Sequence, residues 1–496
     1  MKSESRLLST GIDGLDNILN GGFPAKRVYL IQGDPGVGKT TMALKLLLHG
    51  AANGESVLYV TLSETRDEIE GVAASHGWSL APLHIHEMAN ADDGPADRTE
   101  NTLFVPAEVE LGERMRSLLD LIDRLKPRRV VIDSCSELRL LAGTPLRFRR
   151  QILALKRDLV QRNCTMFLLE NALEKGGDVL LQSLVHGVLE LEQLAPLYGR
   201  ERRRLRILKL REVKYRGGYH DFHIETGGIV VYPRLVASEH ARELPREQII
   251  SGVPGLDALL GGGIDRGTST LLLGPAGSGK SSMAFCFVMT AASRGEHSAI
   301  FAFDESEGTM FARAEALGMP LRQHVDSGLV RVKSIDPAEL SPGEFVHEVR
   351  QSVEADRARV VVIDSLNGYF NAMIDEQFVL AQMHELLSYL GHRGVATILV
   401  MAQHGLIGAM AVPIDVSYLA DTVVLLRFFE AQGRVRKAVS ALKKRTGRHE
   451  DSIREYLISS GGLGVGPPLR DFRGVMTGVP DYDSQLPDLN HEEPIG

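Results

Sequence analysis

The feature that most constrains the fold is a long internal repeat. Four landmarks occur twice in the same order: "TGIDGLDNILNGGF" (10–23) with "SGVPGLDALLGGGI" (251–264), "GDPGVGKT" (33–40) with "GPAGSGKS" (274–281), "VVIDS" (130–134) with the same letters at 361–365, and "KLR" (209–211) with "KKR" (443–445). A period this long indicates a duplicated domain, because solenoid repeats run to only tens of residues. The alternative is two unrelated nucleotide-binding domains joined in one chain.

The repeat also predicts where the domains begin and end. At 496 residues, the chain exceeds what one hydrophobic core usually supports. We expect a first domain at 1–235 and a second at 248–480, joined by a polar linker at 236–247. The final stretch, 481–496, carries several acids and prolines and little apolar material, which predicts a disordered acidic tail.

Each half alternates strand-like and helix-like segments. In the first half, the apolar run "VYLIQ" leads into the glycine-rich motif, "LKLLLHGAA" follows at helical spacing, and "SVLYVTL" is typical of a buried strand. The second half repeats the pattern with "STLLL", "MAFCFVMTAA" and "SAIFAF". Such alternation predicts an α/β fold with two tandem domains, each a mostly parallel sheet flanked by helices.

Composition narrows the class of protein. The 64 acidic and 56 basic residues give a net charge of -8, which argues against nucleic acid as a partner. The three cysteines, Cys135, Cys164 and Cys286, form no CxxC pair, so neither a disulfide framework nor a zinc site is indicated. The longest apolar stretches fall short of the roughly 20 residues that span a bilayer. We expect a cytoplasmic protein with no signal peptide and no membrane span.

The two glycine-rich motifs match GxxxxGK[ST], the phosphate-binding loop of ATP-binding proteins, and are called cradles below. Lys39 and Lys280 are expected to neutralise the β- and γ-phosphates, and the hydroxyls of Thr40 and Ser281 to face Mg²⁺. The remaining ATP-binding candidates are the motif glycines and the residues after these hydroxyls: Gly33, Gly36, Gly38, Thr41, Gly274, Gly277, Gly279 and Ser282. The pattern predicts ATP and Mg²⁺ as cofactors.

Apolar strands that end in an acid follow each cradle. "VVIDS" supplies Asp133 and Asp364, which are expected to hold Mg²⁺ through its water shell. The alternative is that each acid caps the helix that follows its strand.

A hydrolase or kinase also needs a carboxylate that orients or deprotonates the attacking group. "VTLSETRDE" offers Glu64, and "FAFDESEG" offers Asp304 and Glu305, at the same strand end of each repeat. The alternative is helix capping by Ser63, Thr65 and Ser306, with Thr65 and Glu68 in a capping box.

The stretch "RERRRLRILKLREVKYR" (200–216) is the one serious candidate for a nucleic-acid patch, although Tyr215 is its only aromatic residue. One alternative is a solvated strand face around 204–206. The other is that Lys209 and Arg211, with the matching Lys443 and Arg445, act in trans on the ATP of a neighbouring subunit. Such trans-acting residues require a ring.

Taken together, the tandem cradles, the "GLD…GGG" lead-ins, the acids at strand ends, the K-x-R triplets and "HEDSIREYLIS" (449–459) resemble the KaiC-like family, two-domain RecA-like ATPases of bacterial clock systems. The resemblance covers roughly residues 5–480. It implies a homohexamer of two stacked rings with ATP at subunit interfaces. It also implies slow ATPase activity in the first ring, and serine/threonine autokinase and autophosphatase activity in the second.

Two positions depart from the family pattern. The paired catalytic glutamates of the family fall on Ser63 and Glu64 and on Asp304 and Glu305, so the first pair has lost one carboxylate. The phosphoacceptor pair falls on Ser417 and Tyr418 in "DVSYLADT", with tyrosine where threonine belongs. Phosphorylation of Ser417 alone is the simplest expectation; the alternative is that both are ordinary interface residues.

The resemblance implies a protein partner for the first ring, either KaiB-like or a sensor kinase. Two rival functions keep the same fold. One is an ATPase switch that never phosphorylates itself. The other is a DNA-dependent ATPase like RadA or the replicative helicases, which the net charge and the lack of an aromatic-basic loop disfavour. A nucleotide-dependent scaffold with degenerate catalysis finds support only in Ser63.

Overall fold

The computed structural model describes residues 7–88, 107–171, 179–196, 199–240, 247–371, 376–403, 416–470, 472–475 and 481–482. The chain divides into two compact units, Met1–Arg234 and Leu235–Gly496. Most of the expected tail, 483–496, and residues 241–246 of the expected linker lie outside the described residues. The described part of that linker forms a 3₁₀ helix, Ala237–His240, and Ala237 is buried in the core of the second unit.

The first unit alternates strands and helices along most of its length. Its elements are β1 (Leu7–Leu8), α1 (Asp13–Ile18), β2 (Phe23–Pro24), β3 (Val28–Gly33), α2 (Lys39–Ala52), β4 (Val57–Thr61), α3 (Arg66–Ser75), β5 (His84–Glu87), α4 (Ala107–Leu125), β6 (Arg129–Asp133), α5 (Cys135–Ala142), α6 (Pro145–Gln161), β7 (Thr165–Asn171), α7 (Val179–Leu184), β8 (Gly187–Leu194), β9 (Arg202–Leu210), β10 (His220–Glu225) and β11 (Gly228–Tyr232).

The second unit repeats this order. Its elements after the 3₁₀ helix are β12 (Gln248–Ile249), α8 (Pro254–Leu259), β13 (Ile264–Asp265), β14 (Ser269–Gly274), α9 (Lys280–Ser293), β15 (Ser298–Ala302), α10 (Glu307–Ala316), α11 (Leu321–Asp326), β16 (Val330–Ser334), α12 (Pro342–Glu354), β17 (Val360–Asp364), α13 (Leu366–Asn371), α14 (Glu376–His392), β18 (Ala396–Ala402), β19 (Thr422–Ala431), β20 (Arg434–Lys444), β21 (Arg454–Ser459), β22 (Gly462–Pro468), β23 (Phe472–Arg473) and β24 (Asp481–Tyr482).

Each unit is built on one nine-stranded sheet with the same topology. The strand orders are β5-β4-β6-β7-β3-β8-β9-β10-β11 and β16-β15-β17-β18-β14-β19-β20-β21-β22. In both sheets the first six strands are parallel and the last three pair antiparallel. The expected α/β fold with two tandem, mostly parallel sheets is therefore confirmed.

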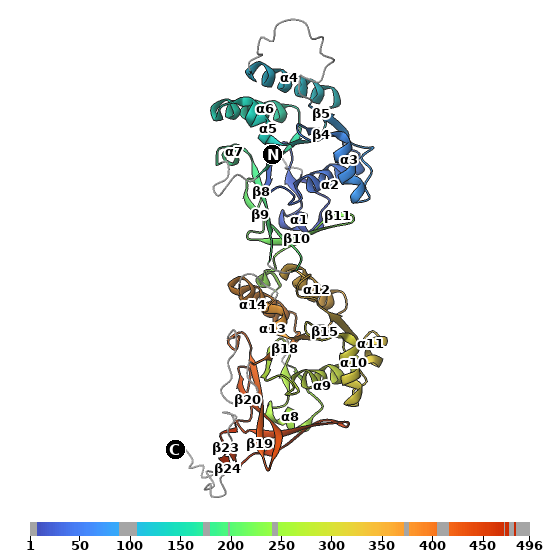
Figure 1. The fold of residues 1–496 in the computed structure, drawn as a ribbon, viewed down its shortest axis with the longest axis vertical. Helices are drawn as coiled ribbons and strands as arrows, with labels where there is room; N and C mark the ends of the chain where they lie inside the picture. Colours follow the sequence, from blue (N-terminus) through green and yellow to red (C-terminus); the bar gives the residue numbers. More distant parts are fainter. Residues whose placement is uncertain are drawn as a thin grey trace. The chain divides into compact units, whose positions relative to one another are not determined.

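Helices cover both faces of each sheet, which explains why inner parallel strands such as β3, β4, β6 and β14 are buried along their whole length. In the first unit, α1–α3 share one core with the sheet, and α4–α7 share another on the opposite face (Figure 1). In the second unit, α8–α11 and α12–α14 divide in the same way. Among the described residues, no helix is long and apolar enough to cross a membrane.

The antiparallel half of each sheet carries a matched irregularity. The pairing of β8 with β9 shifts register between Val188 and Leu189, and that of β19 with β20 shifts between Val423 and Val424. Such a bulge re-aims the side chains beside it. Lys209 pairs with Val188 and Lys443 with Val423, so the two K-x-R triplets sit next to the same irregularity.

Candidate functional site

The two cradles follow the carboxyl ends of β3 and β14, which lie inside their sheets, and each leads into a helix that begins at its lysine. Gly38 and Gly279, immediately before these helices, have φ values of +111° and +99°. An added Cβ would lie 2.6 Å from Cδ1 of Ile224 at Gly38, and 2.5 Å from Cδ1 of Ile458 at Gly279. Only glycine combines this backbone conformation with this close packing.

The cradle lysines are held over their own loops. Nζ of Lys39 donates to the carbonyl oxygens of Gly33 (2.8 Å) and Asp34 (2.9 Å), and Nζ of Lys280 to those of Gly274 (2.9 Å) and Pro275 (2.7 Å). Burial lowers the pKa of both ammonium groups, that of Lys280 to about 8. A bound anion, such as a phosphate, would favour the charged form of these lysines and so oppose the effect of burial.

The acids at the ends of β6 and β17 reach the hydroxyls of the cradle helices. Oδ2 of Asp133 accepts from Thr40 Oγ1 at 3.0 Å and from the buried Tyr59 hydroxyl at 2.6 Å. Asp364 accepts from Ser281, and burial raises the pKa of its carboxyl. A hydroxyl and a carboxylate beside a phosphate cradle fit Mg²⁺, a hard cation that prefers oxygen ligands and keeps several waters.

Among the described residues, no cation forms an ion pair with the expected catalytic acid of the first unit. Glu64 follows β4 and is half-buried, and within the described part of the chain its Oε2 has no hydrogen-bond partner. Burial raises the pKa of Glu64, and the negative charges of Asp133 and Glu68 raise it further, whereas Lys39 opposes the shift. A raised pKa makes a carboxylate a stronger base near neutral pH.

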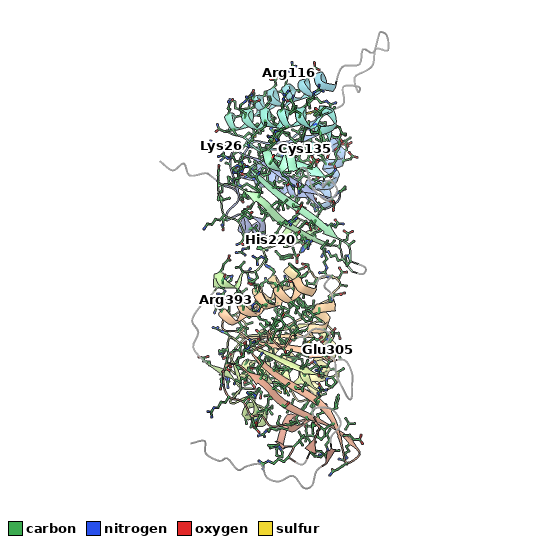
Figure 2. The ribbon with its side chains drawn as sticks, turned by 90° about the vertical axis from the view of Figure 1, so that its left-hand side faces the viewer. Lys26, Arg116, Cys135, His220, Glu305 and Arg393 are labelled. Carbon is green, nitrogen blue, oxygen red and sulfur yellow. The ribbon has the colours of Figure 1, made fainter. Side chains whose placement is uncertain are left out.

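The acids of the second unit are both held by neighbours. Nη2 of Arg313 on α10 lies 2.6 Å from Oε2 of Glu305, and Asp304 accepts a hydrogen bond from the hydroxyl of Ser365. Figure 2 marks Glu305 in this unit. Burial still raises the pKa of Glu305, and Asp364 adds to the shift, although Arg313 opposes it.

Helix capping occurs next to both acids, but it uses other side chains. Thr65 and Glu68 form a complete capping box at the start of α3, and Ser306 accepts from the amide of Thr309 at the start of α10. The capping alternative was therefore right for Thr65, Glu68 and Ser306. Neither of these caps uses the carboxylate of Glu64 or of Glu305.

The K-x-R residues lie two strands away from the cradle strands. Nζ of Lys209 on β9 donates to the carbonyl oxygen of Gln182 (2.7 Å), and Nζ of Lys443 on β20 donates to those of Ser417 (3.0 Å) and Ala420 (2.8 Å). Both lysines thus fasten the segment that leads into the neighbouring parallel strand. Arg211 and Arg445 directly follow the two strands and are exposed.

Ser417 and Tyr418 belong to the short segment that Lys443 holds. Ser417 is half-buried, whereas Tyr418 is 54% exposed. The carbonyl oxygen of Tyr418 accepts from Nη2 of Arg445 at 2.9 Å, and Arg445 also pairs with Asp421. Both residues of the second K-x-R triplet therefore contact the expected phosphoacceptor segment.

Two central arginines of the basic stretch 200–216 are paired with carboxylates of the neighbouring strand. Nε of Arg204 lies 2.8 Å from Glu192, and Nε of Arg206 lies 2.5 Å from Glu190, both on β8. The two guanidinium groups also stack over the ring of Tyr219. Arginines that are already paired with carboxylates are poor donors to a phosphate backbone.

Three residues near the two sites escaped the sequence analysis. Tyr59 binds Asp133; Glu170, at the end of β7, adds a buried acid beside Lys39; and Arg313 binds Glu305. The matching positions of the other repeat carry different side chains: Ile300, Met401 and Val72. Tyr59 and Glu170 lie in apolar strands, and Arg313 lies on a helix. None of the three belongs to a recognisable sequence motif, so the sequence alone did not indicate that they contact the site.

An aromatic pair adjoins the first cradle helix. The rings of His76 and Trp78 lie 4.8 Å apart, and Nε2 of His76 lies 3.5 Å from Oγ1 of Thr41. Nζ of Lys45 lies 5.6 Å from the centre of the Trp78 ring. Trp78 is the single tryptophan of the chain.

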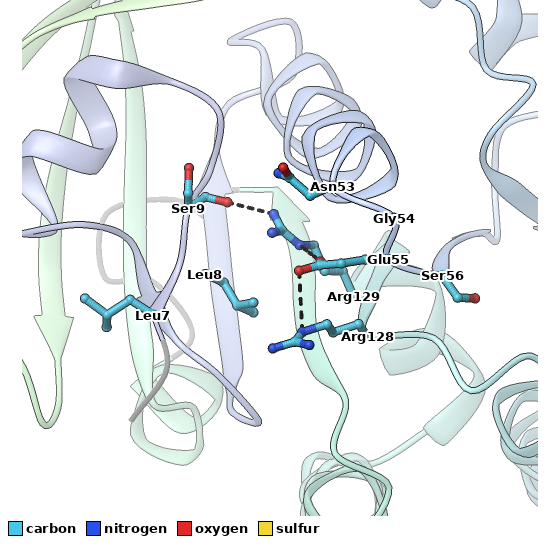
Figure 3. Close-up of a pocket in the computed structure, with 9 residues that line it drawn as sticks. All are labelled: Leu7, Leu8, Ser9, Asn53, Gly54, Glu55, Ser56, Arg128 and Arg129. Carbon is cyan, nitrogen blue, oxygen red and sulfur yellow. Dashed lines mark hydrogen bonds and ion pairs between the residues drawn. The ribbon is translucent and has the colours of Figure 1, made fainter. Parts of the chain in front are cut away.

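A separate pocket opens at the amino ends of β4 and β6, whereas the cradle follows the carboxyl end of β3 (Figure 3). Glu55 lies there between two arginines, 2.5 Å from Nε of Arg129 and 3.4 Å from Nε of Arg128. Arg129 also donates to the carbonyl oxygens of Ser9 and Leu46. Ligands of open α/β sheets bind at the carboxyl ends of the strands. We therefore interpret this charge cluster, at the opposite ends, as a structural contact between elements of the first unit and not as a ligand site.

Comparison with known sequences agrees with this geometry. The model of the family described as "ATPase: KaiC" matches residues 8–236 and 249–470. The chain belongs to the KaiC ATPase family. It is a tandem-domain ATPase, and membership implies that it binds and hydrolyses ATP.

Similar proteins match over nearly the whole chain. The circadian clock oscillator protein KaiC of Parathermosynechococcus lividus is 27% identical over 485 residues, 95% of this chain and 87% of its own length. KaiC of Synechococcus elongatus is 26% identical, over 95% of this chain and 91% of its own length. The circadian clock protein KaiC3 of Synechocystis sp. is 25% identical, over 96% and 95%.

Proposed function

We propose that this KaiC-family ATPase is a Mg²⁺-dependent regulatory enzyme with two chemistries. The first unit hydrolyses ATP, and the second is a serine/threonine autokinase and autophosphatase that acts on Ser417. The observation that carries the proposal is the contact of Lys443 and Arg445 with the main chain of Ser417 and Tyr418. It joins the expected acceptor to the residues expected to reach the ATP of a neighbouring protomer.

In the first unit, Glu64 is the proposed base for water. Its carboxylate is half-buried, its Oε2 has no hydrogen-bond partner among the described residues, and its pKa is raised, which suits proton abstraction. Thr40 and Asp133 are the proposed Mg²⁺ residues; bound there, the ion would neutralise charge on the phosphates. Ser63 is exposed and supplies no carboxylate, so hydrolysis at this site depends on Glu64 alone.

In the second unit, the proposed reaction is transfer of the γ-phosphoryl group to Ser417. The serine hydroxyl oxygen forms a bond to the γ-phosphorus, the bond from that phosphorus to ADP breaks, and Glu305 takes the hydroxyl proton. Ser281 and Asp364 are the proposed Mg²⁺ residues, with Lys280 on the phosphates. Asp304 lies beside Glu305, and its hydrogen bond from Ser365 keeps it close to the same strand end.

The proposed trans-acting residues require a ring, because each acts on the ATP of a neighbouring protomer. We propose a homohexamer in which Lys209 and Arg211, and Lys443 and Arg445, act on the nucleotide of the next protomer. The main support is the matched placement of both triplets beside the same bulge. The full-length match to KaiC proteins supports the same assembly.

We further propose that the output is recruitment of a cytoplasmic protein partner, either KaiB-like or a sensor kinase. An exposed row on α6 supports this: Leu146, Leu153 and Val160 are 59%, 42% and 39% exposed, and Arg150 and Arg157 stand between them. The matching helix α14 has Gln, Ala, His, Ser and Gly at these positions. An apolar row with arginines suits a partner that presents apolar side chains and carboxylates.

Mass spectrometry of the protein after incubation with Mg·ATP tests the proposal. Phosphate on Ser417 is expected in the wild type and absent from Ser417→Ala and from Glu305→Gln. ADP production without any phosphopeptide would leave the rival ATPase switch. Stimulation of the ATPase by DNA at low salt would favour the DNA-dependent alternative, which the paired arginines of β9 disfavour.

A further inference from the structure

The two proposed bases occupy equivalent positions but differ in what holds them. Glu64 and Glu305 each stand one residue before the capping residue of the following helix, α3 or α10. Oε2 of Glu64 has no hydrogen-bond partner among the described residues, whereas Oε2 of Glu305 lies 2.6 Å from Nη2 of Arg313. The difference lies in one position, because the seventh residue is Val72 in α3 and Arg313 in α10.

Arg313 is held so that it stays on Glu305. Its guanidinium carbon lies 5.0 Å from the centre of the buried Phe285 ring, and its side chain is 31% exposed. Phe285 is the sixth residue of α9, and the sixth residue of the matching helix α2 is Leu44. The second unit therefore has both the cation and the aromatic platform on which it rests, and the first has neither.

We propose that Arg313 is a positioning residue that restrains Glu305 and thereby makes ATP hydrolysis at the second site slower than at the first. The guanidinium group pairs with one carboxylate oxygen of Glu305 and makes this carboxylate a weaker base. Water is therefore deprotonated less often, and less ATP is hydrolysed at the second site. The inference rests on the proposed role of Glu305 as the base. It explains how one duplicated site spares its ATP while the other consumes it.

The test isolates each site in the full-length protein. In a Lys39→Ala background, ADP production reports the second site, and Arg313→Val is expected to raise it at least threefold. Arg313→Lys keeps a cation near Glu305 and is expected to restore most of the restraint. Arg322→Val is the matched control, because Arg322 lies 4.4 Å over the Phe311 ring and no contact described here joins it to Glu305.

The reciprocal change moves the restraint to the first site. In a Lys280→Ala background, Val72→Arg is expected to lower ADP production at least threefold.

The pH profile of second-site hydrolysis separates a positioning role of Arg313 from a merely structural one. Arg313 and Asp364 are the charged groups that act on Glu305. Without Arg313 the pKa of Glu305 rises, so the acid limb of second-site hydrolysis should move to higher pH in Arg313→Val and stay in place in Arg322→Val.

Second-site hydrolysis that is unchanged, slower or undetectable in Arg313→Val would overturn the inference, as would an unshifted acid limb. Phosphate on Ser417 is measured in the same samples. The autokinase proposal fails if that phosphate is absent from the wild type, whatever Arg313→Val does to ADP production. The restraint fails if ADP production does not rise, whether or not Ser417 carries phosphate.

Discussion

Nζ of Lys443 lies 3.0 Å from the carbonyl oxygen of Ser417, and the same atom lies 2.8 Å from that of Ala420. One ammonium group thus holds both ends of the turn that carries the expected acceptor. Lys209 makes the corresponding contact with Gln182 in the first unit, where no acceptor is expected.

Lys443→Ala is therefore expected to lower phosphate incorporation at Ser417 at least tenfold, because the acceptor loses its fixed position. Lys209→Ala is the matched control, and it should leave the level of phosphate on Ser417 unchanged in short incubations with Mg·ATP. Phosphopeptide mass spectrometry measures both. Equal losses in the two variants would indicate a general effect on folding or assembly.

In a Lys280→Ala background, which isolates the first site, Glu64→Gln is expected to reduce ATP hydrolysis by about 10²- to 10⁴-fold, the usual contribution of a general base. Glutamine keeps the size of the side chain and removes its basicity. Glu305→Gln should abolish phosphate on Ser417 and leave most ADP production intact. Steady-state ADP release is measured for both variants. A larger loss in Glu305→Gln than in Glu64→Gln would contradict the assignment of most hydrolysis to the first site.

Tyr59→Phe tests the buried contact with Asp133. The hydroxyl donates to a carboxylate at 2.6 Å, and hydrogen bonds to charged groups contribute about 1.5–3 kcal/mol. Tyr29→Phe removes an equally short bond to the neutral carbonyl of Pro24, for which about 0.5–1.5 kcal/mol is expected. Urea unfolding of both variants should show a larger loss of unfolding free energy for Tyr59→Phe than for Tyr29→Phe. The reverse order would mean that the hydrogen bond from Tyr59 to Asp133 contributes little to stability.

His220, labelled in Figure 2, should make the first unit sensitive to acid. Burial lowers the pKa of His220 to about 4, and its Nδ1 accepts from the amide of Arg234 while Nε2 lies 3.0 Å from the carbonyl oxygen of Arg216. In the unfolded chain, the imidazole of His220 binds a proton below about pH 6.5. In the folded protein, it does so only near pH 4. The stability that neutral His220 contributes is thus fully present above pH 6.5 and is lost as the pH falls toward 4.

The size of this effect can be measured with His220→Gln. Between pH 7 and pH 5, the wild type should lose about 2 kcal/mol more free energy of unfolding than the variant, because glutamine does not titrate. Urea unfolding followed by circular dichroism at the two pH values gives the difference. Identical losses in the two proteins would place the acid sensitivity elsewhere.

The sequence predicted the duplicated fold well, for a physical reason. The cradle needs glycine where the backbone turns left-handed beside Ile224 and Ile458, and it needs a lysine at the start of the next helix. These requirements leave the same motif, GxxxxGK followed by Thr or Ser, in both halves of the sequence. The acids at the ends of β6 and β17 are also visible in the sequence, because each closes an apolar run that follows a cradle.

The differences between the two sites were harder to foresee. Tyr59 looks like any core residue of an apolar strand, and its hydroxyl finds Asp133 only because β4 and β6 are neighbours in the sheet. Arg313 lies eight residues after Glu305, and only the turns of α10 bring it back to the carboxylate. Contacts of this kind depend on tertiary geometry, which the spacing of letters does not encode.

The neighbours of Trp78 give the first site an optical property that the second lacks. A single indole ring lies against His76, which approaches Thr41 in the cradle helix, and the Lys45 ammonium lies over its face. A nucleotide that moves any of these groups changes the emission of the only tryptophan in the chain. Intrinsic fluorescence should therefore report nucleotide binding at the first site, whereas binding at the second site gives no direct tryptophan signal, and no added label is needed.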